Sequence, residues 1–207
     1  MVRVALLSGG KDSLYAAMQR WPVDLGLVLV YRFPRPSPHL LNLGKTVETL
    51  NLAGIPVVVA RLHRGREREE TVEILRRLGA DEVVAGDVYV EDHLRYMEAV
   101  AADAGARLSE PLWGMDPVEL AYREAEAGIE ALFTGVDARL SRWLGRVFSR
   151  DTVEELVEDA KRAGVDPLGE QGEYHTLVID SPRHEERLPY QVVEKLEIQG
   201  YHLLRVV

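Results

Sequence analysis

The chain has 207 residues, of which 46% are hydrophobic and 29% are charged, a composition typical of a soluble globular protein that can bury a core. Its net charge of −9 argues against binding to a nucleic-acid backbone, because proteins that do so normally present a basic surface. The absence of cysteine excludes disulfides, thiolate metal sites and cysteine nucleophiles. No signal peptide and no apolar run of about 18 residues is recognisable, so we expect a cytoplasmic protein with no membrane contact.

The first expected unit is a strand, a tight glycine turn and a helix. Residues 2–7 are almost all apolar and form a run short enough for a buried strand, and Leu14, Ala17 and Met18 recur at helical spacing. Between them lies the segment Ser-Gly-Gly-Lys-Asp-Ser at residues 8–13. This geometry directs backbone N–H groups and a helix N-terminus at one place, which suits an anion such as phosphate.

The side chains of this segment are equally suited to a nucleotide. Gly9 and Gly10 let the backbone approach a phosphate without side-chain clashes. Ser8 and Ser13 offer hydroxyl donors, and Lys11 offers a cation. The glycine spacing fits neither a Walker A loop nor a dinucleotide-binding loop. The alternative to a phosphate-binding loop is a generic glycine turn before a helix.

Strand and helix patterns alternate up to about residue 105. We expect strands at residues 25–31, 56–62 and 82–85, and helices at residues 40–53, 66–78 and 90–104. The proline-rich segment at residues 32–39 must be a loop, and it serves either as a cover over a substrate or as a surface connector. The alternation predicts an α/β fold in which a parallel sheet carries helices on both faces.

In such a sheet, ligands bind beyond the carboxyl ends of the strands, at the point where the strand order reverses. Residues 8–13, Tyr31 and the pair Gly86-Asp87 all follow expected strands, so we expect them to meet at a nucleotide site. Asp12 and Asp87 are candidate ligands for the Mg²⁺ that accompanies a triphosphate. The alternative for Asp12 is a cap at the helix N-terminus.

The second half is less regular, and we place a domain boundary where the alternation stops, giving domains at residues 1–104 and 105–207. We expect helices at residues 116–128 and 151–164, each opened by a capping box, and one or two helical turns at residues 139–147. Strands are expected at residues 129–134, 177–180, 191–198 and 201–207.

Residues 169–176 read Gly-Glu-Gln-Gly-Glu-Tyr-His-Thr and concentrate groups that can move protons. In a strand that begins here, Glu173 and His175 would share one face, and Tyr174 and Thr176 the other. Glu173 or His175 would then be the proton acceptor of a reaction. The alternatives are a turn with solvated carboxylates and a structural histidine.

Taken together, these motifs resemble the diphthine–ammonia ligase (diphthamide synthase) family within the N-type ATP pyrophosphatases. The resemblance covers nearly the whole chain and rests on segments in the family's order, which are residues 8–13, 86–88, 111–114, 144–146 and 169–176. It implies a Rossmann-like domain of the adenine nucleotide alpha hydrolase type followed by a smaller α/β substrate domain.

The resemblance also implies an enzyme, an ATP-dependent ligase that forms AMP and pyrophosphate. ATP would adenylate the diphthine carboxylate of elongation factor 2, and ammonia, drawn from ammonium, would displace AMP to give diphthamide. The implied cofactors are ATP and Mg²⁺, and the implied partner is elongation factor 2 that carries diphthine.

The family's site residues transfer to this sequence by position. The nucleotide would be bound by Ser8, Gly9, Gly10, Lys11, Asp12, Ser13, Tyr31, Gly86 and Asp87. Mg²⁺ would be bound by Asp12, and the catalytic set would be Lys11, Asp12, Glu170, Glu173 and His175. The substrate would contact Arg95, Glu98, Trp113 and Tyr174.

Two residues depart from the pattern of many family members, which have glycine at the position of Gln171 and glutamate at that of His175. The acceptor therefore stays open. An adenylating enzyme for a small molecule or tRNA and a non-catalytic nucleotide-binding protein are the alternatives, although the negative charge argues against tRNA. The lack of cysteine argues against sulfur transfer and glutamine hydrolysis. A homodimer is compatible with the sequence, and the composition is typical of a thermophilic archaeal protein.

Overall fold

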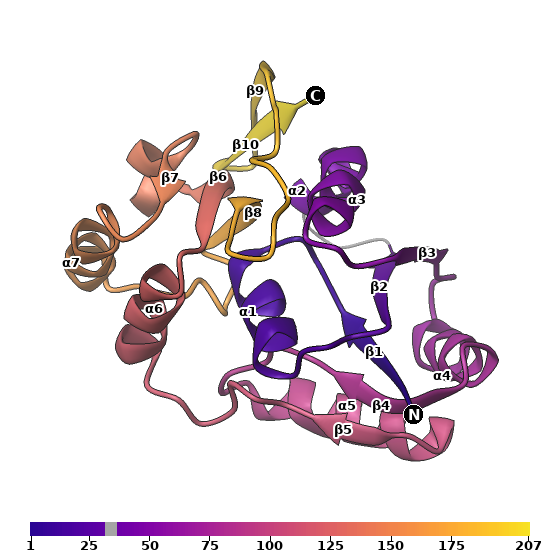
Figure 1. Ribbon diagram of the computed structural model, residues 1–207. Coiled ribbons are helices and arrows are strands. Elements are labelled where there is room, and N and C mark those ends of the chain that lie inside the picture. The colour runs from indigo at the N-terminus through magenta and orange to yellow at the C-terminus, as the bar shows by residue number, and fades with distance from the viewer. Residues whose placement is uncertain (32–36) are drawn as a thin grey trace. The chain divides into compact units, whose positions relative to one another are not determined.

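The computed structural model of the chain describes residues 1–31 and 37–207 (Figure 1). The chain divides into two compact units. The first consists of Met1–Ser8, Asp12–Pro34 and Ile55–Gly114, and the second of Gly9–Lys11, Arg35–Gly54 and Met115–Val207. The loop expected at residues 32–39 lies, over residues 32–36, outside the described residues. The domain boundary expected at residue 105 stays a prediction.

The first unit is built on a five-stranded sheet in the order β3-β2-β1-β4-β5, in which all neighbours are parallel. Its strands are β1 (Val2–Leu6), β2 (Leu25–Val30), β3 (Val57–Arg61), β4 (Ala80–Val84) and β5 (Arg107–Ser109). This architecture confirms the predicted α/β class. The strand β5 was not predicted, because three residues are too few to show a periodic pattern.

Helices cover this sheet (Figure 1), and apolar side chains of two of them pack in its core. The helices are α1 (Lys11–Gln19), α4 (Glu67–Arg77) and α5 (Glu91–Ala104). Leu75 of α4 and Val100 of α5 are buried in one cluster with Val4 and Leu27 of the sheet. Each such side chain contributes about 1.5–3 kcal/mol by leaving water. Ala5 points to the other face, because successive strand residues alternate.

The second unit is built on antiparallel strands around β6. Its strands are β6 (Glu130–Asp137), β7 (Val147–Phe148), β8 (Tyr174–Asp180), β9 (Val192–Ile198) and β10 (Tyr201–Val206). The strand β6 pairs with β7, β8 and β10, and β10 also pairs with β9. The helices of this unit are α2 (Pro38–Leu41), α3 (Leu43–Leu52), α6 (Pro117–Glu126), the 3₁₀ helix η1 (Ala138–Trp143) and α7 (Val153–Ala163).

The single helix expected at residues 40–53 is wrong, since the structure has two helices that meet at Asn42. The Asn42 side chain is 3% exposed and is satisfied by backbone partners. Its amide group donates to Pro38 O at 3.1 Å and to Leu204 O at 2.9 Å, and its Oδ1 accepts from Val206 N at 2.9 Å. Tertiary hydrogen bonds to β10 therefore decide where the helix breaks, and no local pattern reveals them.

Of the two predicted capping boxes, the structure shows half of the first. Asp116 Oδ1 accepts from Glu119 N at 2.9 Å at the start of α6, whereas the Glu119 carboxylate accepts from Arg123. The second is wrong, because α7 begins after Thr152 rather than after Asp151. The Thr152 hydroxyl donates to Val147 O at 2.8 Å and leaves the helix without a side-chain cap. Within residues 1–31 and 37–207, no helix combines the length and apolarity that crossing a membrane requires.

Candidate active site

The strand order of the first unit reverses between β1 and β4. The glycine segment, residues 8–13, follows β1, and the pair Gly86-Asp87 follows β4. A Cβ atom added to Gly86 would lie 3.2 Å from both Asp12 O and Ser13 Cα. The segment after β4 therefore lies close against the start of α1, and any side chain at residue 86 would force one of them to shift. The structure thus brings together the two segments that the strand pattern had predicted to meet.

The serines at the two ends of the glycine segment contact one another. Ser13 Oγ accepts from Ser8 N at 3.3 Å and lies 3.2 Å from Ser8 Oγ. Asp12 is half-buried in the first turn of α1, where the backbone N–H groups of the helix favour negative charge. Hydroxyl donors, N–H groups and one carboxylate at a helix start are the groups that a phosphate with its Mg²⁺ requires.

Tyr31 and Asp87 belong to a second group at the carboxyl edge of the sheet. Burial raises the pKa of the Tyr31 hydroxyl, and Tyr96 and the negatively charged Asp87 raise this pKa further. Asp87 Oδ1 lies 3.2 Å from His93 Nδ1, and Asp87 N donates to Glu110 Oε2 at 3.2 Å. The sequence did not point to His93 or Glu110, because neither stands in a motif and only the fold brings them to Asp87.

The expected substrate residues of the first unit lie on different elements. Arg95 and Glu98 are on the exposed face of α5, where Arg95 donates to Glu91 Oε2 at 2.6 Å. Trp113 is half-buried in the turn after β5, and its backbone N donates to Glu110 O. Their contact with a substrate stays a prediction.

The middle of the glycine segment, Gly9–Lys11, is counted with the second unit. Gly9 has a φ of +81°, and a Cβ atom there would lie 2.9 Å from Thr46 Cγ2. Gly9 O accepts from Val178 N of β8 at 2.8 Å. Gly9 is therefore required both by its left-handed backbone conformation and by the close approach of α3.

Lys11 is fully buried, and so is the carboxylate it contacts. Its ammonium lies 3.0 Å from Glu124 Oε2 of α6 and 5.5 Å from the ring centroid of Phe148. Its backbone N donates to Thr176 Oγ1 at 3.2 Å. In this arrangement the charge of Lys11 faces a carboxylate inside the second unit rather than solvent. The expected contact of Lys11 with a phosphate stays a prediction.

The segment at residues 169–176 enters β8 through a turn that hydrogen bonds of nearby side chains stabilise. Glu173 is 7% exposed, and its Oε2 accepts from Gln171 N at 3.1 Å. Glu170 N donates to Asp166 Oδ2 at 2.9 Å, and the Tyr174 hydroxyl donates to Pro167 O at 2.6 Å. Two carboxylates and a phenol are thus held close together along the chain, and their catalytic role stays a prediction.

His175 faces a second histidine. Its Nδ1 lies 3.3 Å from His39 Nε2, with the two rings edge to face. Burial, together with the charge that His39 can carry, lowers the pKa of His175 from 6.5 to about 3. His175 is therefore a neutral imidazole at neutral pH. His39 was not predicted, since only the start of α2 brings it to β8.

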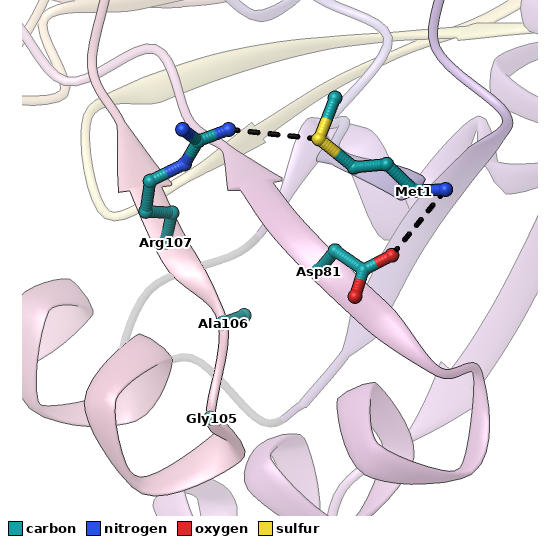
Figure 2. A pocket seen from close by; sticks show the side chains of 5 residues that line it. All are labelled: Met1, Asp81, Gly105, Ala106 and Arg107. Atoms are coloured by element: carbon teal, nitrogen blue, oxygen red, sulfur yellow. Dashed lines mark hydrogen bonds and ion pairs between the residues drawn. The ribbon is translucent and has the colours of Figure 1, made fainter.

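A pocket of about 590 Å³ lies at the amino edge of the parallel sheet (Figure 2). It is lined by Met1, Asp81, Gly105, Ala106 and Arg107. Figure 2 shows the Met1 amino group directed at Asp81, 3.7 Å away, and the Arg107 guanidinium directed at the Met1 sulfur. Because ligands of parallel sheets bind at the carboxyl edge, this pocket is not the nucleotide site.

Comparison with known proteins identifies the family. The model described as Diphthamide synthase N-terminal domain matches residues 1–108, and the one described as Diphthamide synthase C-terminal domain matches residues 116–205. No curated protein sequence matches the chain. A crystal structure described as a predicted subunit of tRNA methyltransferase from Methanocaldococcus jannaschii is similar, with 17% identity, a TM-score of 0.43, and coverage of 87% of this chain and 97% of that one. The two matched domains together span most of the sequence, and the chain belongs to the diphthamide synthase family, whose members are ATP-dependent ligases.

Proposed function

We propose that this chain is a diphthine–ammonia ligase that converts the diphthine of elongation factor 2 into diphthamide. The observation that carries the proposal is the match of both halves of the chain to the two domains of one synthase family. The substrate carboxylate attacks the α-phosphorus of ATP, the bond to the β-phosphate breaks, and pyrophosphate leaves. Ammonia then attacks the acyl adenylate, AMP leaves, and the nitrogen loses a proton as the amide forms.

The glycine segment is the proposed binding site for the phosphates. Backbone N–H groups of Gly9, Gly10, Asp12 and Ser13 and the hydroxyls of Ser8 and Ser13 stabilise the negative charge that the leaving pyrophosphate acquires. Asp12 would hold Mg²⁺, which when bound neutralises charge on the phosphate oxygens. Gly86 and Asp87 line the same edge, and Tyr31 lies at the end of the neighbouring strand β2.

The proposed acceptor side comprises Glu170, Glu173, Tyr174 and His175, with Arg95, Glu98 and Trp113 as contacts to the protein substrate. The low pKa of His175 makes its imidazole a weak proton acceptor. We therefore assign a neutral, structural role to His175. We assign proton removal to the carboxylate of Glu173, which is buried in the turn that enters β8.

The test is a reaction with ATP, Mg²⁺, ¹⁵N-ammonium and elongation factor 2 that carries diphthine. Pyrophosphate and AMP should form in equal amounts, and mass spectrometry should find ¹⁵N in the diphthamide of the factor. Formation of AMP without labelled nitrogen on the factor would exclude diphthamide synthesis and leave an adenylating enzyme with another substrate.

A matched pair of variants connects this chemistry to Glu173. Glu173→Gln keeps the shape of the side chain but cannot accept the proton, so adenylation should persist while amide formation slows. His175→Gln should keep amide formation close to that of the wild type, since a neutral side chain replaces a neutral imidazole. Loss of amide formation in His175→Gln but not in Glu173→Gln would reverse the assignment.

A further inference from the structure

We infer that Glu124 is a positioning residue for the proposed ATP reaction, and that Lys11 acts through Glu124 rather than as a ligand of a phosphate. This inference rests on the proposed function and assigns a role to a buried ion pair that the reaction itself does not use. The pair would hold the residues Gly9–Lys11 in the shape in which the backbone N–H groups of Gly9 and Gly10 bind phosphate.

The two charges of this ion pair are buried, which keeps Lys11 and Glu124 together. Lys11 and Glu124 both have no exposed surface, and their charged atoms are 3.0 Å apart. The ammonium also lies 5.5 Å from the ring centroid of Phe148 and 5.7 Å from that of Tyr174. If Lys11 turned away to reach a phosphate, the Glu124 carboxylate would remain buried without this cation, which is strongly unfavourable. The pair is therefore a fixed element of the second unit.

Hydrogen bonds fix the backbone on both sides of Lys11. Lys11 N donates to Thr176 Oγ1 at 3.2 Å, and Gly9 O accepts from Val178 N at 2.8 Å. These bonds attach both ends of Gly9–Lys11 to β8, while the ion pair attaches the Lys11 side chain to α6. A segment held at three points has little freedom left, so the N–H groups of Gly9 and Gly10 are already oriented before a nucleotide binds.

The two possible roles of Lys11 predict opposite effects of neutralising Glu124. If Lys11 bound phosphate directly, Glu124→Gln would release its ammonium and leave pyrophosphate formation unchanged or faster. If the ion pair positions the segment, Glu124→Gln loosens it and the reaction slows. Glu126→Gln is the matched control, because it makes the same change at an exposed residue of the same helix.

The experiment has two readouts on the full chain. Hydrogen exchange of the Lys11 and Val178 amides, followed by NMR, should accelerate about tenfold or more in Glu124→Gln and stay at the wild-type rate in Glu126→Gln. The kcat for pyrophosphate release should fall about 100-fold in Glu124→Gln, the typical loss when one preorganised donor is removed. Unchanged exchange or unchanged kcat in Glu124→Gln would overturn the inference.

A double variant separates positioning from direct binding. Lys11→Met combined with Glu124→Leu replaces the pair by apolar side chains of similar size and leaves no isolated charge. It should restore amide protection and bring kcat to within about tenfold of the wild type. Restored protection without activity would show that phosphate needs the Lys11 charge, and would refute the inference. A wild-type protein that forms no pyrophosphate would instead refute the proposed function, while the exchange rates would still decide the role of Glu124.

Discussion

Replacing His175 with glutamine should make the fold less sensitive to mild acid. His175 has a folded-state pKa of about 3, against an unperturbed value of 6.5, because it is buried beside His39. Above pH 6.5 the imidazole is neutral in both the folded and the unfolded state, so its titration does not change the free energy of unfolding. Below pH 6.5 His175 binds a proton in the unfolded chain but not in the folded chain, so the free energy of unfolding falls as the pH decreases towards 3.

The size of the effect follows from this difference in proton binding. Stability changes by about 1.4 kcal/mol per pH unit for each proton that only the unfolded state binds. Between pH 6.5 and 5 the wild type should therefore lose about 2 kcal/mol through His175. Glu70, Glu82 and Glu155 have folded-state pKa values lowered below 4.5, so their contributions disappear only in more acidic solution. The chosen pH range thus reports on histidines.

The assay is urea unfolding at pH 7, 6 and 5, followed by circular dichroism, with the free energy of unfolding extrapolated to water. His175→Gln should lose about 2 kcal/mol less than the wild type over this range. A smaller loss should remain, because burial also lowers the pKa of His184. The control is His63→Gln, which replaces an exposed histidine. If His175→Gln and the wild type lost equal stability, the argument that burial keeps His175 neutral would be refuted.

Three further predictions concern the proposed nucleotide site. Ser13→Ala should lower the kcat for pyrophosphate release about 100-fold by removing a hydroxyl donor, whereas Ser141→Ala, at an exposed serine, should not; equal rates would exclude Ser13 from the site. Gly86→Ala should destabilise the fold by about 1–3 kcal/mol in urea unfolding because its Cβ meets backbone atoms at 3.2 Å. Gly44→Ala, a helical position with nothing within 4 Å, should instead stabilise it by about 0.5–1 kcal/mol, so a neutral Gly86→Ala would contradict the close approach. ATP with Mg²⁺ at about 100 times its Kd should raise the free energy of unfolding by about 2.7 kcal/mol, and the absence of any shift in thermal unfolding would argue against nucleotide binding.

The sequence was sufficient to predict the parallel sheet because its signals are local. Apolar runs alternate with helical stripes, and glycines follow the helices, as Gly105 does with a φ of +78°. The meeting of residues 8–13 with Gly86 was also predictable, since the carboxyl ends of neighbouring parallel strands share one edge.

The details that escaped prediction depend on contacts distant in sequence. Nothing near Lys11 indicates that its charge lies against Glu124, or that Thr176 accepts from its backbone. The break at Asn42 depends in the same way on β10, and His39 becomes relevant only because it contacts His175. A motif predicts which groups are available, but the direction of each side chain depends on the partner that satisfies it.

The position of Asn42 has a consequence for synthesis on the ribosome. Its hydrogen bonds reach Leu204 and Val206, which follow it by 162 and 164 residues and are therefore translated much later. Thr49 of α3 likewise donates to Val178 O at 2.6 Å. The helices α2 and α3 are made early, but they cannot form all of these hydrogen bonds until β10 has left the exit tunnel of the ribosome. The second unit therefore cannot complete its fold before β10 is made, and a nascent chain that stalls before β10 would leave these helices exposed to chaperones and proteases.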